Sequence, residues 1–229
     1  MSRSPKLYRG DRGEVVEVLI PPIGLAGSLC LPQQSRAIIA FAHGSGSSRL
    51  SPRNTYVAEA LNHAGFATLL FDLLTKEEEA DRSNVFDVPL LAERLTTALN
   101  WTFADPRTDK LPVGLFGAST GAAAALVATA ALGDRIGAVV SRGGRPDMAA
   151  AALEKVRAPT LLIVGGNDQD VLALNRSALA RLICPKELKV IPGASHLFLE
   201  SGALDAVVAE ASAWFTRHLS PAARHAREG

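Results

Sequence analysis

The chain of 229 residues has only two cysteines, few aromatic residues (5%) and almost no surplus charge, with a formal net charge of +1. Two cysteines cannot build a cysteine-ligated metal site, and we expect Cys30 and Cys184 to be buried free thiols, as is usual in the cytoplasm. A balanced charge gives no basis for nucleic-acid binding. No apolar run is long enough for a membrane span, and the first residues lack the apolar stretch of a signal peptide. These absences predict a cytoplasmic protein that uses no metal ion and binds neither nucleic acid nor membranes.

Strand-like and helix-like segments alternate along the chain. Strands are expected at 15–20, 25–31, 37–42, 66–71, near 113–116, and at 136–140, 160–164 and 188–191. Helices are expected at 52–64, around 88–99, at 122–132, about 146–156, at 171–183 and around 204–215. The first two strands predict an antiparallel pair, and the later alternation predicts a parallel sheet. We therefore predict an α/β fold in a single domain (1–229), with a mostly parallel central sheet of about eight strands, helices on both faces and loose termini (1–13 and 220–229).

Several local features follow from residue type. Ser51 before Pro52 is typical of a helix N-cap, and the run 77–79 of three glutamates is expected to be a solvated loop. Between residues 141 and 159 there is room for only one helix and its loops. This stretch is too short to contain a lid domain, so the sequence predicts no lid domain and an open site.

The segment Gly117-Ala118-Ser119-Thr120-Gly121 fits the pattern G-x-S-x-G. It lies between a short apolar segment, typical of a buried strand, and an alanine-rich segment, typical of a helix. In such an elbow the serine occupies a strained turn, and both glycines are needed because a side chain would collide with neighbouring backbone. We predict that Ser119 is a nucleophile and that the Thr120 N–H faces a developing oxyanion.

A serine nucleophile needs a base, and the base needs an orienting acid. In this fold the order is Ser, then Asp or Glu, then His, on loops after late strands. His196 is the best candidate for the base, the alternative being an ordinary loop histidine. Asp168 and Asp170 compete for the acid. We favour Asp168 because it lies closer to the preceding strand, and we expect Asp170 to cap the following helix.

The loop His43-Gly44-Ser45-Gly46 follows a strand that is apolar throughout. Such a loop supplies the second oxyanion donor in this fold, and the Ser45 N–H is our choice. His43 is expected to be structural and to bond the loop backbone. A phosphate cradle is the rival interpretation, but the loop has neither the P-loop lysine nor G-x-G-x-x-G spacing.

Arg142 and Arg145 follow the strand next to the elbow. Either guanidinium could face the site and bind a substrate carboxylate. The plainer alternative is a solvated loop or a salt bridge to Asp147, which is the more common fate of a surface arginine.

The elbow, the loop 43–46, the segment 165–168 and the pair Ser195-His196 together resemble the α/β-hydrolase superfamily. The lidless length resembles its dienelactone-hydrolase-like branch, over roughly residues 14–218. Dienelactone hydrolases carry cysteine where this chain has Ser119, so the resemblance implies a cofactor-free serine carboxylesterase acting on small, short-acyl esters. Relatives of this type also resemble a domain found fused to phosphoribosyltransferases.

Other functions use the same residues. An acyltransferase, a lactone hydrolase or a cofactor-free haloperoxidase would share the triad Ser119, Asp168 and His196. A non-catalytic binding member of the fold is the alternative from another class. A complete triad argues against it, because binding alone does not require all three residues.

Overall fold

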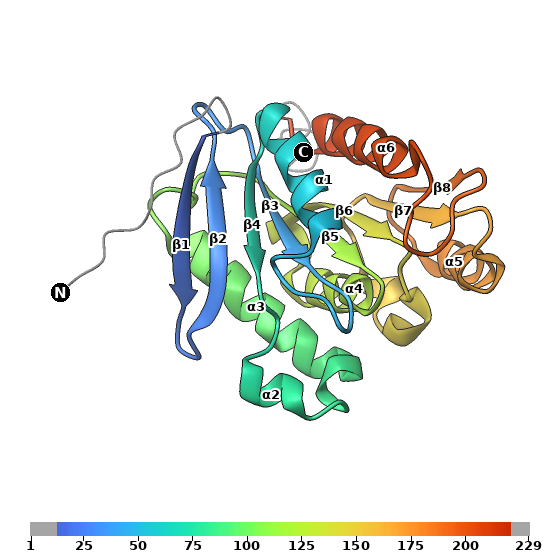
Figure 1. Cartoon of the computed structure of the whole chain (residues 1–229), viewed down its shortest axis with the longest axis horizontal. Coiled ribbons are helices and arrows are strands. Elements are labelled where there is room, and N and C mark those ends of the chain that lie inside the picture. Colours follow the sequence, from blue (N-terminus) through green and yellow to red (C-terminus); the bar gives the residue numbers. More distant parts are fainter. Residues whose placement is uncertain (1–12, 221–229) are drawn as a thin grey trace.

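An eight-stranded sheet runs through the protein in the order β1-β2-β4-β3-β5-β6-β7-β8 (Figure 1). The computed structural model describes residues 13–220, so nearly all of the predicted loose termini lies outside the described residues. The strands are β1 (Glu14–Ile20), β2 (Leu25–Leu31), β3 (Ile38–Ala42), β4 (Ala67–Phe71), β5 (Val113–Ala118), β6 (Ile136–Arg142), β7 (Thr160–Gly165) and β8 (Lys186–Ile191). Strand β2 is antiparallel to β1 and β4, and the other neighbouring pairs are parallel. The predicted hairpin and mostly parallel sheet are confirmed.

Helices cover both faces of the sheet, as the alternating pattern predicts (Figure 1). They are α1 (Pro52–His63), α2 (Lys76–Ala80), α3 (Val88–Ala104), α4 (Thr120–Leu132), α5 (Gln169–Arg181) and α6 (Ala203–His218). Helices α1 and α6 share one apolar layer with the sheet, whereas α3, α4 and α5 contribute to the layer on the other face. Strands β3, β4, β5 and β7 are buried along their whole length because both faces are covered.

The apolar stripes of the helices build these two layers. In α3, Leu91, Leu95 and Leu99 recur at helical spacing, and all are buried against the sheet. In α6, Val207 and Phe215 play the same part on the opposite face. Burying one such side chain contributes about 1.5–3 kcal/mol. The layers therefore fix the strands whose carboxyl ends carry the candidate site.

The helix predicted for 146–156 is wrong. Two short 3₁₀ turns, η3 (Pro146–Ala149) and η4 (Leu153–Lys155), occupy this region. The amides of Ala150 and Val156 bond to carbonyls three residues earlier rather than four. The bend between the turns keeps Ala149, Leu153 and Val156 in the core, so tertiary packing overrides the helix propensity of this alanine-rich segment.

Two local predictions are also corrected. Ser51 occupies the N-cap position of α1, but its side chain makes no capping hydrogen bond. The three glutamates 77–79 lie in helix α2 rather than in a loop. Thr75 and Glu78 form a capping box there, and Arg94 of α3 pairs with Glu78 at 2.6 Å. These contacts hold α2 against α3.

Cys30 and Cys184 are buried free thiols, as predicted. Burial, followed by the charge of Glu59, raises the pKa of Cys30 to about 11, so this thiol stays protonated at neutral pH. Among residues 13–220, no helix combines the length and the apolar character that crossing a bilayer requires.

Candidate active site

Ser119 lies in a sharp turn between β5 and α4, with φ 51° and ψ −121°. This positive φ is strained for a residue with a side chain. The flanking glycines are required by close contacts: a Cβ on Gly117 would lie 2.5 Å from the Ala122 Cα, and one on Gly121 would lie 2.2 Å from the Ala42 oxygen. The reason given for both glycines from the sequence is therefore confirmed, and Ser119 lies at the carboxyl end of the central strand.

His196 and Asp168 meet across two loops. The Nδ1 of His196 is 2.6 Å from Oδ2 of Asp168, and the Asp168 side chain is only 14% exposed. The structure thus brings together two of the three predicted catalytic side chains. Asp170, the competing acid, is exposed in the first turn of α5. It does not cap the helix as predicted, because α5 begins at Gln169 and the N-cap position falls on Asp168.

The loops after β7 and β8 are tied to each other by hydrogen bonds. The N–H of Asn167 donates to the Ala194 oxygen at 2.9 Å, and its side-chain amide donates to the Gly193 oxygen at 2.8 Å. The N–H of Gly166 donates to the Ile191 oxygen at 2.8 Å. These bonds hold Asp168 and His196 in register without relying on either side chain.

Backbone contacts connect the elbow with the histidine loop. The Ser119 N–H donates to the oxygen of Arg142 at 3.2 Å. The next residue, Gly143, lies against His196, since a Cβ there would be 3.5 Å from Nδ1 of the ring. On the other side, a Cβ on Gly44 would lie 3.7 Å from the Ser119 Oγ. No hydrogen bond between Ser119 Oγ and His196 is found in the described part of the chain.

The predicted oxyanion donors lie side by side, with a contact that the sequence did not predict. The Ser45 N–H donates to the Thr120 hydroxyl oxygen at 2.9 Å. Thr120 is buried, and its own N–H belongs to the N-terminus of α4. Only the G-x-S-x-G pattern pointed to this position, and it says nothing about the side chain of its fourth residue. The hydroxyl of Thr120 is therefore a group of the site that sequence analysis missed.

His43 has the structural role predicted for it. Its Nδ1 lies 3.0 Å from the Gly44 oxygen, and the Leu73 N–H donates to its Nε2 at 3.0 Å. The ring is thus a neutral tautomer that donates through Nδ1. Burial lowers the pKa of His43 below its ordinary value, despite a hydrogen bond and two acidic neighbours that raise it. His43 fixes the loop that presents Ser45.

The two candidate arginines differ in their surroundings. Arg145 forms a two-pronged pair with Asp147, at 2.9 and 2.7 Å, which is the plainer alternative given above. This hydrogen bond to Arg145 holds the pKa of Asp147 below its usual value. Arg142 is buried, and its Nη1 atom has no hydrogen-bond partner among residues 13–220.

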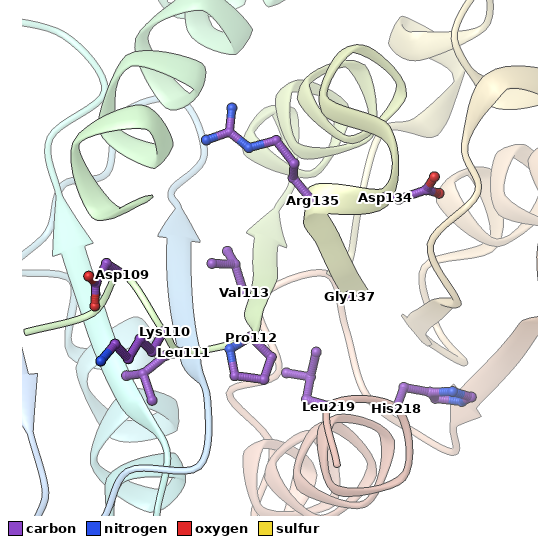
Figure 2. Close-up of a pocket in the computed structure, with 10 residues that line it drawn as sticks. All are labelled: Asp109, Lys110, Leu111, Pro112, Val113, Asp134, Arg135, Gly137, His218 and Leu219. Atoms are coloured by element: carbon purple, nitrogen blue, oxygen red, sulfur yellow. The ribbon is translucent and has the colours of Figure 1, made fainter. Parts of the chain in front are cut away.

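Two hollows differ in size and position. A small one of about 10 Å³ borders Ser45 and Thr120, and its apolar lining consists of Leu73, Leu74, Val85 and Leu91. A much larger one of about 730 Å³ lies at the amino ends of β5 and β6, away from the nucleophile (Figure 2). Within residues 13–220, no three His, Cys, Asp or Glu side chains are grouped as they would be to hold a metal ion.

Comparisons with known proteins identify the family and the fold. Residues 25–218 match the sequence profile of the Dienelactone hydrolase family. The crystal structure of dienelactone hydrolase from Anabaena variabilis is similar, with a TM-score of 0.87 and 53% identity over 95% of this chain and 100% of that chain. A Xanthomonas campestris protein, described as an α/β serine hydrolase without a lid, has a TM-score of 0.71 at 22% identity over 94% of this chain and 98% of that chain. That likeness shows the fold alone.

A longer relative carries a different name. A Mycobacterium tuberculosis protein (strain H37Rv), provisionally named a phosphoribosyl transferase, is 58% identical over 208 residues. The match covers 91% of this chain but 47% of that protein, so this chain spans about half its length. The family profile over residues 25–218, together with the Anabaena structure, shows that this chain has the α/β-hydrolase fold and belongs to the dienelactone hydrolase family.

Proposed function

We propose that the protein is a cofactor-free serine carboxylesterase that hydrolyses small, short-acyl esters through an acyl-enzyme. The observation that carries the proposal is the 2.6 Å contact between His196 and Asp168, in a fold whose elbow presents Ser119. A carboxylate on Nδ1 fixes the ring so that Nε2 carries a free electron pair. That tautomer is the one a general base requires.

In the proposed reaction, Ser119 Oγ attacks the acyl carbon of the ester while His196 Nε2 removes the proton of the Ser119 hydroxyl. The resulting imidazolium is stabilised by the Asp168 carboxylate. The tetrahedral intermediate collapses, its carbon–oxygen bond to the alcohol breaks, and His196 returns the proton to the leaving oxygen. Water then attacks the acyl-enzyme by the same steps, and a carboxylic acid leaves.

The oxyanion would be held by the N–H groups of Ser45 and Thr120. The Thr120 N–H lies at the start of α4, where the helix dipole favours negative charge. The Thr120 hydroxyl accepts the Ser45 N–H in this structure, so this amide would exchange that bond for one to the oxyanion. The proton of the Thr120 hydroxyl remains available to donate to the oxyanion, so we assign the hydroxyl as a third donor.

The small hollow beside Ser45 supports the choice of short acyl groups. Its volume of about 10 Å³ leaves room for about one water molecule, and leucine and valine side chains line it. Long acyl chains gain affinity only where apolar surface covers them, at about 25 cal/mol per Å². We also propose a cytoplasmic location and a small-molecule ester as the partner. The phosphoribosyl transferase name belongs to a longer protein, about half of which this chain matches.

Labelling with a fluorophosphonate tests the mechanism. We expect one label per chain, on the peptide that carries Ser119, and Ser119→Ala should lose both the label and ester turnover. Ser195→Ala, which changes another serine near the site, is the matched control and should still be labelled. Labelling that survives in Ser119→Ala would contradict the proposal.

An acyl-length series tests the substrate size. We expect kcat/KM to be highest between acetate and about hexanoate esters, because the site offers little apolar cover. No jump in rate is expected when the substrate passes its solubility limit. A maximum at ten carbons or more would show a deep groove and contradict this part of the proposal.

A further inference from the structure

Asn175 lies in the middle of α5, and its side chain is completely buried. Its Nδ2 donates two hydrogen bonds, to the Gly144 oxygen at 3.0 Å and to the Val171 oxygen at 2.8 Å. The second bond stays within the helix, whereas the first joins residues 31 positions apart in the chain. Two carbonyl acceptors require two hydrogens, so an amide nitrogen suits this place and a carboxylate or an aliphatic side chain does not.

The amide of Asn175 is buried at a cost to stability. Its Oδ1 atom is buried without a hydrogen-bond partner among residues 13–220. A buried acceptor that lacks a donor destabilises the fold, and an apolar side chain of similar shape avoids that loss. Stability alone therefore does not account for the amide. What it holds outside its own helix is residues 142–145, which we call the β6 turn.

The β6 turn connects the nucleophile with the base. The Ser119 N–H donates to the Arg142 oxygen at 3.2 Å, and the Arg145 N–H donates to the Ser119 oxygen at 3.1 Å. Between these two residues, Gly143 has φ 52° and lies against His196, since a Cβ there would be 3.5 Å from both Nδ1 and Cε1 of the ring. A shift of the β6 turn would therefore disturb the Ser119 backbone and the surroundings of the His196 ring together.

Gly144 is the residue through which the β6 turn is tied to α5. It has no side chain that could anchor the turn, because a Cβ there would lie 2.0 Å from the Ser141 Oγ. Its carbonyl bonds Asn175 instead. Helix α5 also begins at the acid, since Asp168 occupies its N-cap position. Asn175 thus links the helix that follows the acid to the turn that contacts the nucleophile and the base.

We propose that Asn175 is a positioning residue of the active site. Its amide holds the β6 turn so that Ser119 and His196 keep the geometry that proton transfer between them requires. It acts through the Gly144 carbonyl and not on the substrate. As a statement about catalysis, this rests on the proposed esterase function. The link between Asn175 and the His196 ring does not, and it can be measured without a substrate.

The kinetic test uses Asn175→Leu, which keeps the approximate shape of the side chain and removes both hydrogen bonds. We expect kcat for 4-nitrophenyl butyrate to fall about 10- to 100-fold with KM within about twofold, because misplaced reacting groups slow the chemical step more than they weaken ester binding. Fluorophosphonate labelling of Ser119 should slow by a similar factor, since it requires the same activated hydroxyl.

Asn62→Leu is the matched control. Asn62 is also a buried asparagine whose Nδ2 donates two hydrogen bonds, to the Phe66 oxygen and to the Thr68 hydroxyl, both at 3.0 Å. It lies at the amino end of β4, at the opposite edge of the sheet from Ser119. Asn62→Leu should lower the melting temperature but leave kcat within about twofold. Equal losses of kcat in the two leucine variants would reduce Asn175 to a purely structural role and overturn the proposal.

A spectroscopic test needs no substrate. The NMR resonance of the His196 Cε1 proton, assigned by its loss in His196→Gln, reports on the contact between the ring and Gly143. We expect Asn175→Leu to shift or broaden this resonance, and Asn62→Leu to leave it as in the wild type. A merely structural loss of stability would not single out this ring.

Should Asn175→Leu fail to fold, Asn175→Thr decides the question. Thr102 and Thr129 are buried in helices of this protein and donate to the carbonyl oxygen four residues earlier, at 2.9 and 2.7 Å. The hydroxyl introduced by Asn175→Thr should bond Val171 in the same way but is too short to reach Gly144. It therefore removes only the contact with the β6 turn. Wild-type kcat in folded Asn175→Thr would overturn the proposal.

The results separate this proposal from the proposed esterase function. Wild-type kcat in Asn175→Leu overturns the positioning role while the esterase function stands. If the wild-type protein shows neither ester turnover nor labelling of Ser119, the esterase function is overturned, and the His196 resonance alone decides. An unchanged resonance in Asn175→Leu then overturns the link between Asn175 and the ring.

Discussion

The two ends of the same strands, β5 and β6, differ sharply. At their carboxyl ends the chain makes a strained elbow, cross-bonded loops and a hollow of only about 10 Å³. At their amino ends the hollow measures about 730 Å³ (Figure 2). Its lining includes the charged residues Asp109, Lys110, Asp134 and Arg135, and the guanidinium carbon of Arg135 lies 3.7 Å from the centroid of the Phe103 ring. Positioned polar groups, rather than the volume of a hollow, therefore mark the candidate site.

The physical reason lies in the parallel sheet. Loops that leave the carboxyl ends of neighbouring strands converge at one edge, so groups distant in sequence meet there. Asp168 and His196 meet across 28 positions of the chain by this route. At the amino end, Asp134 pairs with Arg157 at 3.7 Å, and both side chains are largely exposed.

A matched pair of carboxylate-to-amide changes should show the largest difference in activity between the two ends. Asp168→Asn removes the group that fixes the His196 tautomer, and we expect kcat to fall about 10³- to 10⁴-fold. Asp134→Asn at the amino end should change kcat less than twofold. Ester kinetics on both variants check this, with Asp170→Asn as a second control. A mild Asp168→Asn together with a severe Asp170→Asn would contradict our choice of acid.

Glycine substitutions at the two ends should separate two costs: a clash of the new side chain with neighbouring backbone, and the strain of a positive φ. In Gly121→Ala the new methyl meets the Ala42 and His43 oxygens at 2.2 and 2.3 Å, so we expect a loss of about 3 kcal/mol or more in unfolding free energy. Gly133 has φ 56° but open space around it, and Gly133→Ala should cost about 1 kcal/mol. Urea unfolding of both variants measures the difference. Equal losses would show that the elbow can relax.

Changes at Thr120 test what its hydroxyl does at the carboxyl end of the strands. Thr120→Val keeps the shape and removes the hydroxyl, and we expect kcat to fall about 10- to 100-fold with little change in KM. Thr120→Ser should restore most of the rate. Steady-state kinetics decide between two roles for the hydroxyl. If kcat rises in Thr120→Val, the hydroxyl merely occupies the Ser45 N–H and competes with substrate.

The pH dependence of stability should reveal the buried His43. Because burial lowers the pKa of the folded ring, the unfolded chain binds a proton that the folded ring does not. The contribution of the neutral His43 to the free energy of unfolding is fully present above the ordinary histidine pKa of about 6.5. It is lost as pH falls below that value, by up to about 1.4 kcal/mol per pH unit. Urea unfolding between pH 8 and 5 should show a shallower loss in His43→Gln. An unchanged slope would mean that the folded ring accepts the proton.

Sequence reasoning reached the fold because its signals are local. Apolar runs, glycines and alternating periods identify strands and helices without knowledge of their neighbours. The segment 146–156 shows where this fails, since its alanines favour a helix but packing of Leu153 and Val156 requires two short turns. The glutamates 77–79 are a different case, because Thr75 and Glu78 form a capping box, a local pattern that predicts a helix start and that the sequence analysis did not use.

The sequence by itself determined the sheet, the elbow at Ser119 and the order of the acid and the base, because these depend on short patterns and chain order. Only the tertiary structure decided that Asp168 rather than Asp170 meets His196, that Thr120 bonds Ser45, and that Arg145 is paired whereas Arg142 is not. Each of these depends on which side chains from distant segments come within about 3 Å, the range of a hydrogen bond. Residue type and spacing cannot fix such distances, because the packing of whole elements sets them.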